Sequence, residues 1–406
     1  MTDALTSTRG TWRIGARSWT TVVVAFISRL IDASKATAFM VLTATATGSP
    51  ATVAVLAVCA TAPVILLGPS IGVQIDRRSP SRMLAFGLGL QALIAVVLVL
   101  VSGSGQIRVP VLVGGALLLG TCQAVTDNCL NVLLPHVTHP DRILRANGIM
   151  STGQSIARIV GPVAGSALAV LAPHILFLVW SVLSAVLCLV VLTRIGNTAV
   201  HSRVSEAKPS WRDGFAWIAA SVPTRRLLTA VTLNNIAYGS MAAVLPILAL
   251  DSLGLSPATY GIVASTTSLA ALLGSILVTA IGARATLRLA ALSSLTAQLL
   301  GFTLLAVSWS TPSLFAAVAV LGLSTGVWNV VSSTTLMAIV PAEVRGRVMA
   351  AYRSIAFAGS PAGNIAGGLT GEGWLRVPLY IATCAAAISL TVFAREPREQ
   401  LTDQEK

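Results

Sequence analysis

Three charged residues interrupt the first long apolar run of the sequence, which spans residues 18–46. Arg29, Asp32 and Lys35 follow one another at intervals of three, so a helix would carry them within about 120° of one face. A charge at the centre of a membrane costs about 3 kcal/mol, so such residues usually face protein or water and often serve transport. Two alternatives follow for these side chains. They form a structural ion pair, or they provide a proton-coupling carboxylate, Asp32, beside two cations that contact a substrate.

A second polar stripe lies in the apolar run of residues 110–134. Gln123, Asp127 and Asn131 are spaced by four residues and therefore share a helix face. Asp127 has no cation three or four residues away, which makes it the freer candidate for a proton carrier. The alternative for Asp127 is a fixed ion pair with Arg158, which lies in a later run. Arg158 is either that partner or an anchor for an anionic group of a substrate.

The composition indicates which solvent surrounds these residues. Of 406 residues, 55% are hydrophobic and 10% are charged, and the mean hydropathy is +0.82, which is more apolar surface than a water-soluble domain can bury. We predict an all-α membrane protein with twelve transmembrane helices, located in the inner (cytoplasmic) membrane of the cell. The runs long enough to cross a bilayer, about twenty residues or more, are 18–46, 51–75, 82–102, 110–134, 146–171, 174–193, 227–250, 257–282, 287–308, 312–340, 346–371 and 374–394.

The basic residues orient the chain in the membrane. A net charge of +13 would suit nucleic-acid binding in a soluble protein, but here the cations occupy short gaps between apolar runs. With the N-terminus in the cytoplasm, 21 of the 27 Lys and Arg residues fall on cytoplasmic segments, and only Arg108 and Arg376 fall on outer loops. This asymmetry predicts that both termini are cytoplasmic. It also explains the charge without a nucleic-acid partner.

The longest polar stretch of the chain separates six runs from six. Within it, residues 211–218 have the aromatic anchors of a short interfacial helix. The predicted organisation is a cytoplasmic N-terminal segment (1–17), an N-terminal six-helix bundle (18–193), a cytoplasmic central loop (194–226), a C-terminal six-helix bundle (227–394) and a cytoplasmic tail (395–406).

The two halves carry matching motifs. Residues 68–82 begin with Gly-Pro and end in a basic cluster, and residues 274–288 repeat this pattern as Gly-Ser and a basic cluster 206 positions later. Residues 161–165, Gly-Pro-Val-Ala-Gly, correspond to Ser-Pro-Ala-Gly at 360–363, 199 positions later. Parallel repeats of six spans are typical of transporters whose two bundles rock around a central site.

These motifs resemble those of the major facilitator superfamily over about residues 17–395. Residues 68–82 look like its signature between spans two and three, and residues 157–165 look like the Gly-Pro motif of its drug/proton antiporter branches. Together with Pro-Ala-Glu-Val-Arg-Gly-Arg-Val at 341–348, the pattern is most similar to the branch of macrolide-efflux and enterobactin-exporter proteins. One feature differs: many drug/proton antiporters carry an Arg in the fourth span, where this chain has Gln123 and Asp127.

The resemblance implies a major facilitator fold and a secondary active transporter. The implied activity is proton-coupled efflux of an amphipathic small molecule, such as an antibiotic, a siderophore or another natural product, by alternating access. An importer or uniporter of a small organic solute on the same fold is the alternative. Because spans one, four, seven and ten line the cavity in this superfamily, the cavity candidates are Arg29, Lys35, Gln123, Asn131, Asn234, Asn235, Tyr238, Trp328, Asn329 and Ser332, joined by Gln154 and Arg158 from the fifth span.

Two further motifs point to conformational roles. The resemblance implies a latch between the end of span two and the start of span eleven that holds the cytoplasmic side closed. In the fifth span, glycines allow close helix contact and a proline weakens the local hydrogen-bond ladder, which serves either ordinary packing or a gating bend. The latch residues are Asp76, Arg77, Arg345 and Arg347, and the bend residues are Gly161, Pro162 and Gly165.

Other classes of function fit the sequence less well. None of the three lysines follows a Gly-rich phosphate-binding loop, which excludes an ATP-driven pump within this chain. A membrane-embedded enzyme is the rival from another class, but the four histidines fall in loops or at span ends, without an HExxH motif or paired carboxylates. We expect no catalytic residue, metal or cofactor. The expected state is a monomer whose partners are a small-molecule substrate, protons and the lipid bilayer.

Overall fold

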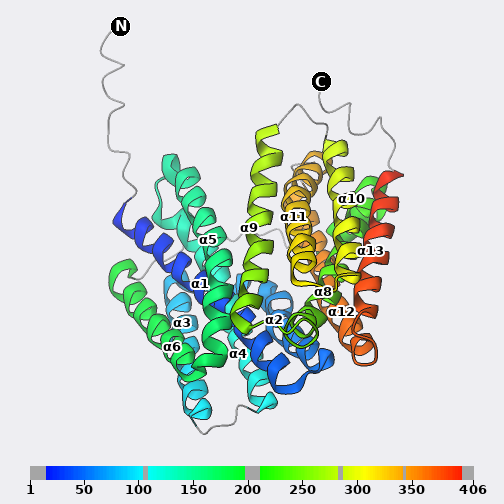
Figure 1. The fold of residues 1–406 in the computed structure, drawn as a ribbon. Helices are drawn as coiled ribbons and strands as arrows, with labels where there is room; N and C mark the ends of the chain where they lie inside the picture. The colour runs from blue at the N-terminus through cyan, green and yellow to red at the C-terminus, as the bar shows by residue number, and fades with distance from the viewer. Residues whose placement is uncertain (1–14, 104–107, 197–210, 282–286, 342–343, 396–406) are drawn as a thin grey trace, which may run out of the picture.

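The computed structural model describes residues 15–103, 108–196, 211–281, 287–341 and 344–395, and its regular structure in these ranges is entirely helical. Twelve helices in these ranges are long and one is short (Figure 1). The prediction of an all-α chain is therefore confirmed. The helices are α1 (Ala16–Thr47), α2 (Pro50–Arg77), α3 (Pro80–Ser102), α4 (Val109–Val137), α5 (Ile143–Leu171), α6 (Pro173–Val190), α7 (Trp211–Ala220), α8 (Val222–Ile247), α9 (Pro257–Ile281), α10 (Leu287–Ala306), α11 (Thr311–Ile339), α12 (Arg345–Gly371) and α13 (Val377–Ala394).

Length and composition decide which helices can cross a membrane. Of the described helices, ten are long and apolar enough to do so. The two long helices outside this set are α1, with 32 residues, and α12, with 27. Both exceed the length that a bilayer requires, but both carry several charges: Arg17, Arg29, Asp32 and Lys35 in α1, and Arg345, Arg347 and Arg353 in α12.

The seventh span begins earlier than the sequence indicates. We predicted a central loop that ends at residue 226, whereas α8 begins at Val222. The side chain of Ser221 accepts a hydrogen bond from the backbone N–H of Thr224, and a proline occupies the first turn, which together start the helix before the apolar run does. A short helix, α7, covers the predicted residues 211–218, and its position at the membrane interface stays a prediction.

The helices pair in the same way in the two halves. In the first half α1 packs on α5, α2 on α4 and α3 on α6. In the second half α8 packs on α12, α9 on α11 and α10 on α13. The structure thus repeats one six-helix arrangement, as the sequence motifs suggest.

Glycines set the spacing between the paired helices. A side chain at Gly165 would collide with the backbone carbonyl of Ser34 on α1, and one at Gly363 would collide with the carbonyl of Ile236 on α8. The repeated motifs therefore lie at equivalent backbone contacts, α1 with α5 and α8 with α12. Pro162 is buried inside α5, between these glycine contacts and the second half.

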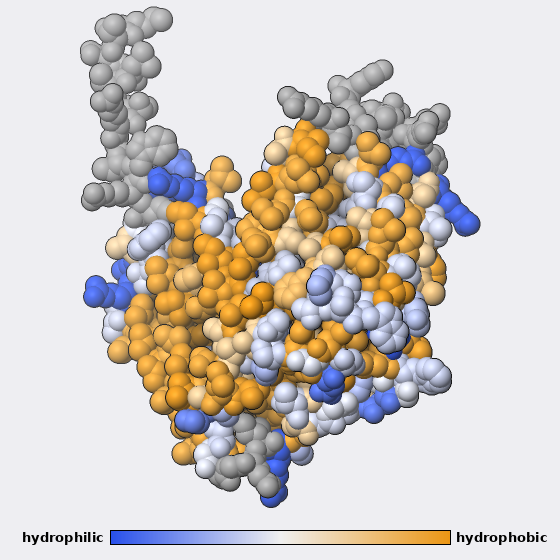
Figure 2. Space-filling view, viewed as in Figure 1, coloured by the Kyte–Doolittle hydropathy of each residue, from blue (hydrophilic) through white to orange (hydrophobic). Residues whose placement is uncertain are grey.

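Helices α5 and α9 join the two halves near the end of the molecule where α9 begins. Gly261 lies against Pro162, and the hydroxyl of Ser265 donates a hydrogen bond to the carbonyl oxygen of Ile159 at 2.5 Å. Toward the other end α5 and α9 diverge (Figure 1), and a notch separates the two halves there (Figure 2). The first turn of α1 and the last turn of α13 lie at this notched end, which the basic residues predict to be cytoplasmic.

Candidate functional site

An ion pair joins α1 to α4. Nη1 of Arg29 contacts Oδ1 of Asp127, and the two side chains are 20% and 18% exposed, respectively. Water, and therefore protons, can reach a pair that is only partly buried. Asp127 thus has a cationic partner, but the partner comes from α1, whereas the sequence alternative was Arg158.

A second, better buried ion pair lies within α1. Nζ of Lys35 is 2.7 Å from Oδ1 of Asp32 and donates to Oε1 of Gln91 at 3.3 Å. Gln91, which is fully buried on α3, donates from Nε2 to the hydroxyl of Ser184 on α6 at 3.0 Å. A buried ammonium is stable only with such partners. Sequence analysis did not select Gln91, although an amide inside the apolar run 82–102 was the available signal.

The two pairs form one electrostatic group. Asp32, Arg29 and Lys35 all lie near enough to Asp127 for their charges to act on it. Two cations face two carboxylates, so the group is formally neutral. Arg158 on α5 lies near Arg29 but is exposed, and it forms no ion pair or hydrogen bond within the part of the chain that the structure describes. It is therefore available to a ligand.

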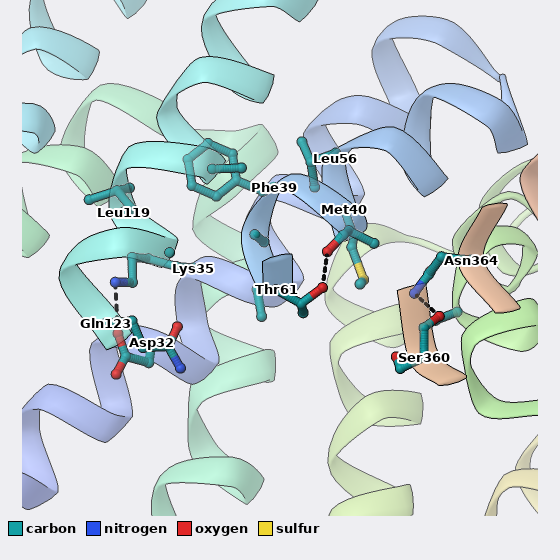
Figure 3. A pocket seen from close by; sticks show the side chains of 16 residues that line it. Asp32, Lys35, Phe39, Met40, Leu56, Thr61, Leu119, Gln123, Ser360 and Asn364 are labelled. Carbon is teal, nitrogen blue, oxygen red and sulfur yellow. Dashed lines mark hydrogen bonds and ion pairs between the residues drawn. The ribbon is translucent and has the colours of Figure 1, made fainter. Parts of the chain in front are cut away.

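A cavity of about 170 Å³ lies between the two halves, beside the Asp32–Lys35 pair (Figure 3). Helices α1, α2 and α4 from the first half and α8 and α12 from the second half line it. Asp32, Lys35 and Gln123 form its polar wall in the first half, and Ser360 and Asn364 form the polar wall opposite. The side chains of Phe39, Met40, Leu56 and Thr61 lie between the two polar walls.

The cavity contains acceptor atoms that lack donors. Asn364 is 3% exposed, and its Nδ2 donates to the carbonyl of Ser360 at 3.0 Å. Its Oδ1 has no hydrogen-bond partner among the described residues, and neither does Oδ2 of Asp32. Unpaired buried acceptors are costly. A bound molecule that offers N–H or O–H groups to this cavity would therefore be favoured.

Further polar side chains occupy exposed positions inside the spans. Exposed polar positions within a transmembrane helix normally face water rather than lipid. These exposed polar positions indicate a water-filled path that leads toward the notched end of the molecule. The side chains that are exposed or half-buried are Asn131 on α4, Asn329, Ser332 and Ser333 on α11, and Asn147, Ser151, Gln154 and Arg158, which share one face of α5. Asn147 and Ser151 were not among the predicted residues.

Several candidates from spans seven and ten lie inside the second half and not in the cavity. The ring of Trp328 is 2% exposed and packs edge-on against Phe393. The hydroxyl of Tyr238 donates to the carbonyl of Leu321 at 2.9 Å, which ties α8 to α11. Asn234 is buried on α8. Because α8 and α11 each present two faces to protein, residue type alone did not distinguish the packed face from the cavity face.

Asn235 also differs from expectation. Its Nδ2 donates to the carbonyl of Val231 on its own helix at 3.0 Å, and its Cβ lies beside Gly359 of α12. This places Asn235 at the contact between α8 and α12. No described contact brings it to the cavity.

The residues of the predicted latch are described only in part. Asp76 and Arg77 end α2, and their side chains lie outside the described residues. Arg345 begins α12 and donates from Nη2 to the carbonyl of Met337 at 3.3 Å, so it caps the end of α11. Arg347 follows two residues later and is half-buried. The latch therefore stays a prediction.

Comparisons with known proteins identify the fold and the family. A family profile described as transmembrane secretion effector matches residues 12–405. No curated protein matches the chain. A crystal structure of a mutant of the nucleoside transporter NupG superposes with a TM-score of 0.76 at 14% identity, over 93% of this chain and 99% of that chain.

Two bacterial structures described as inward-facing are also similar. A homologue of the iron transporter ferroportin superposes with a TM-score of 0.73 at 14% identity, over 93% of this chain and 98% of that chain. A homologue of the human lysosomal transporter Spinster, in an inward-facing and occupied conformation, has a TM-score of 0.73 at 13% identity, over 93% and 96%. At these identities the likeness establishes the fold alone.

The structural matches confirm the major facilitator fold that the motifs suggested, and the family match spans almost the whole sequence. Because the matched family consists of transporters, the alternative of a membrane-embedded enzyme is rejected. The chain is thus a multi-pass membrane protein and a secondary transporter, and it belongs to the transmembrane secretion effector family of the major facilitator superfamily.

Proposed function

We propose that the protein exports an amphipathic small molecule across the inner membrane of the cell in exchange for protons. The Arg29–Asp127 ion pair carries this proposal, because it places a partly exposed carboxylate between two helices that line the cavity. Asp127 lies one turn from Gln123, and Arg29 lies one turn from Asp32, and both of these neighbours line the cavity. A change at the pair is therefore transmitted directly to the cavity wall.

The proposed cycle uses the charge of Asp127. Protonation removes its negative charge, which frees Arg29 to approach a substrate or water, and deprotonation restores the pair. The cavity lies between the two halves, so rocking of one half against the other exposes it to each side in turn. Asp76 and Arg77, with Arg345 and Arg347, would hold the cytoplasmic side closed in the opposite conformation.

The polar walls and the unpaired cations suggest the class of substrate. Four cations and two carboxylates are embedded in the spans, and the two carboxylates are paired with Arg29 and Lys35. Arg158 and Arg353 are exposed and uncompensated among the described residues. Arg158 lies near Arg29, and its potential favours anionic or zwitterionic amphiphiles that also offer hydrogen-bond donors to Asn364. Siderophores with carboxylate or catecholate groups are substrates of this class, whereas macrolides, the other cargo of the branch that the motifs resemble, carry a basic amine and are not.

Vesicle transport tests the proposal and its alternative. In inside-out vesicles with an acidic interior, a panel of fluorescent amphiphiles should include a compound that accumulates and then escapes when a protonophore collapses the gradient. Vesicles without the protein are the control. Equilibration that ignores the gradient would indicate a uniporter, and accumulation driven in the opposite direction would indicate an importer.

Replacing Arg158 should change substrate preference. In Arg158→Gln we expect affinity for an anionic amphiphile to fall about tenfold, because one charge-assisted contact is lost. Affinity for a cationic amphiphile of similar size should change little. Arg353→Gln is the matched control, since it removes an exposed arginine from a span of the other half. A wild-type preference for the cation that persists in Arg158→Gln would contradict the proposed substrate class.

A further inference from the structure

A carboxylate of the second half contacts the first turn of α2 at the end opposite the notch. Glu372 follows α12 directly, and its Oε1 accepts hydrogen bonds from the hydroxyl of Ser49 and from the backbone N–H of Ala51, the latter at 3.1 Å. Ser49 is the residue that caps α2, and its hydroxyl oxygen accepts from the N–H of Thr52 at 3.2 Å. The carboxylate therefore completes the start of a helix that belongs to the other half.

Glycines bring the two backbones together at this contact. A Cβ on Gly371 would lie 2.9 Å from Cβ of Pro50, and one on Gly368 would lie 3.1 Å from Cα of Ala51. Both distances are shorter than ordinary carbon contacts. The end of α12 thus lies against the start of α2 without an intervening side chain, which keeps Glu372 within reach of the α2 backbone.

The chemistry of the contact suits a reversible lock. The first N–H groups of a helix have no partner within the helix, and this end carries a partial positive charge. A carboxylate that accepts from Ala51 satisfies one such group and complements the charge. The contact exists only while the ends of α2 and α12 are together.

The same two helices line the cavity deeper in the molecule. Leu56 and Thr61 of α2 and Ser360 and Asn364 of α12 line it, and they lie between about one and a half and three turns inward from Ala51 and Glu372. Opening the cavity toward this end requires these helix ends to separate. Glu372 therefore lies where separation must begin.

We propose that Glu372 is the gating residue that holds the outer side of the transporter closed. The proposal rests on alternating access. The carboxylate stabilises the inward-facing arrangement by bonding to the first turn of α2, and its contacts break when the outer side opens. It thereby sets the ratio of inward-facing to outward-facing molecules in the absence of substrate.

Two other charged residues lie near this contact, and neither of them has a described bond to the start of α2. Asp251 approaches the same loop, with Oδ2 3.6 Å from the position of a Cβ on Gly48, but among the described residues it makes no hydrogen bond or ion pair. Arg376 donates to the carbonyls of Ala306 and Ser308, and its guanidinium lies 3.5 Å above the ring of Trp309. Its charge is engaged with the loop between α10 and α11.

Distances between spin labels test the gate without a known substrate. Leu171 and Val307 are exposed at the ends of α5 and α10, one in each half, and Leu171→Cys with Val307→Cys provides label sites in a full-length variant whose five native cysteines are replaced. We expect the long-distance population to rise about tenfold in Glu372→Ala. Glu372→Gln, which keeps an acceptor but loses the charge, should fall between Glu372→Ala and wild type.

Asp251→Asn is the matched control, because it neutralises an exposed carboxylate at the same loop that bonds to nothing described. It should leave the distances unchanged. The gate proposal is overturned if Glu372→Ala keeps the wild-type distribution or if Asp251→Asn shifts it equally. A wild-type protein that shows one distance under every condition would instead refute alternating access, so the two failures are distinguishable.

Discussion

Asp127→Asn is expected to abolish proton-driven accumulation while downhill exchange of substrate continues. Asparagine cannot bind or release a proton at the pH of the cell, so the variant stays in a state equivalent to protonated Asp127. Arg29 then loses its ionic partner throughout the cycle. We expect uphill transport in proteoliposomes with an imposed pH gradient to fall to the level of protein-free liposomes.

Two further variants decide how that loss is interpreted. Asp127→Glu retains a titratable carboxylate near Arg29 and should recover part of the uphill transport. Arg29→Gln keeps the titratable group but removes the pair, so it should retain proton binding with altered pH dependence. If Asp127→Asn couples as wild type does, the carboxylate has no part in proton transfer and the proposed cycle is refuted.

Asp32→Ala is expected to destabilise the protein by about 3–5 kcal/mol, the typical cost of leaving one partner of a buried ion pair alone. Lys35 is 4% exposed, and after the substitution only Gln91 would remain to bond its ammonium. The measurement is the free energy of unfolding in mixed detergent micelles. A large decrease in the unfolding midpoint should accompany it.

The double variant Asp32→Ala with Lys35→Met separates charge from packing. Methionine removes the ammonium and keeps much of the side-chain volume, so most of the lost stability should return. Arg29→Ala is the comparison, and because its pair is partly exposed we expect a smaller loss. Equal losses in Asp32→Ala and in the double variant would show that Lys35 does not need its carboxylate.

The sequence was informative about the helices and their repeat because both depend on patterns along the chain. Apolar runs predict span positions, and glycine motifs predict close contacts, as Gly165 and Gly363 confirm. Boundaries were less certain where a cap or a charge outweighs hydropathy. The start of α8 depends on the Ser221 cap, whereas the predicted first span, 18–46, agrees with α1 to within two residues at each end.

Partners between helices could not be predicted, because they depend on how each helix is rotated. Both Arg29 and Arg158 were available to Asp127, and only the packing of α1 against α4 selects Arg29. Likewise, the contribution of Asn364 to the cavity depends on α12 lying beside α2. Polarity identified the candidates of the first half better than those of the second, where Trp328 and Tyr238 pack inward.

The pair between spans one and four offers an explanation of the missing arginine. Many drug/proton antiporters, whose motifs this chain resembles, carry an Arg in the fourth span, whereas this chain has a carboxylate there and an Arg in the first. In this chain the Arg29–Asp127 pair therefore combines a carboxylate of the fourth span with a cation that the first span supplies.

The compensation of charge inside the first half has a consequence for voltage. Moving one elementary charge through the membrane potential changes the energy by about 2.3 kcal/mol per 100 mV. While Asp127 is ionised, Arg29 with Asp127 and Lys35 with Asp32 move as neutral pairs when the halves rock, so of the charges embedded in the described spans only Arg158 and Arg353 move uncompensated through the electric field. Because the protein returns to its starting state, the net charge moved in each cycle should equal the charge of the protons and the substrate that cross. A recording on a supported membrane would then report the stoichiometry of exchange directly.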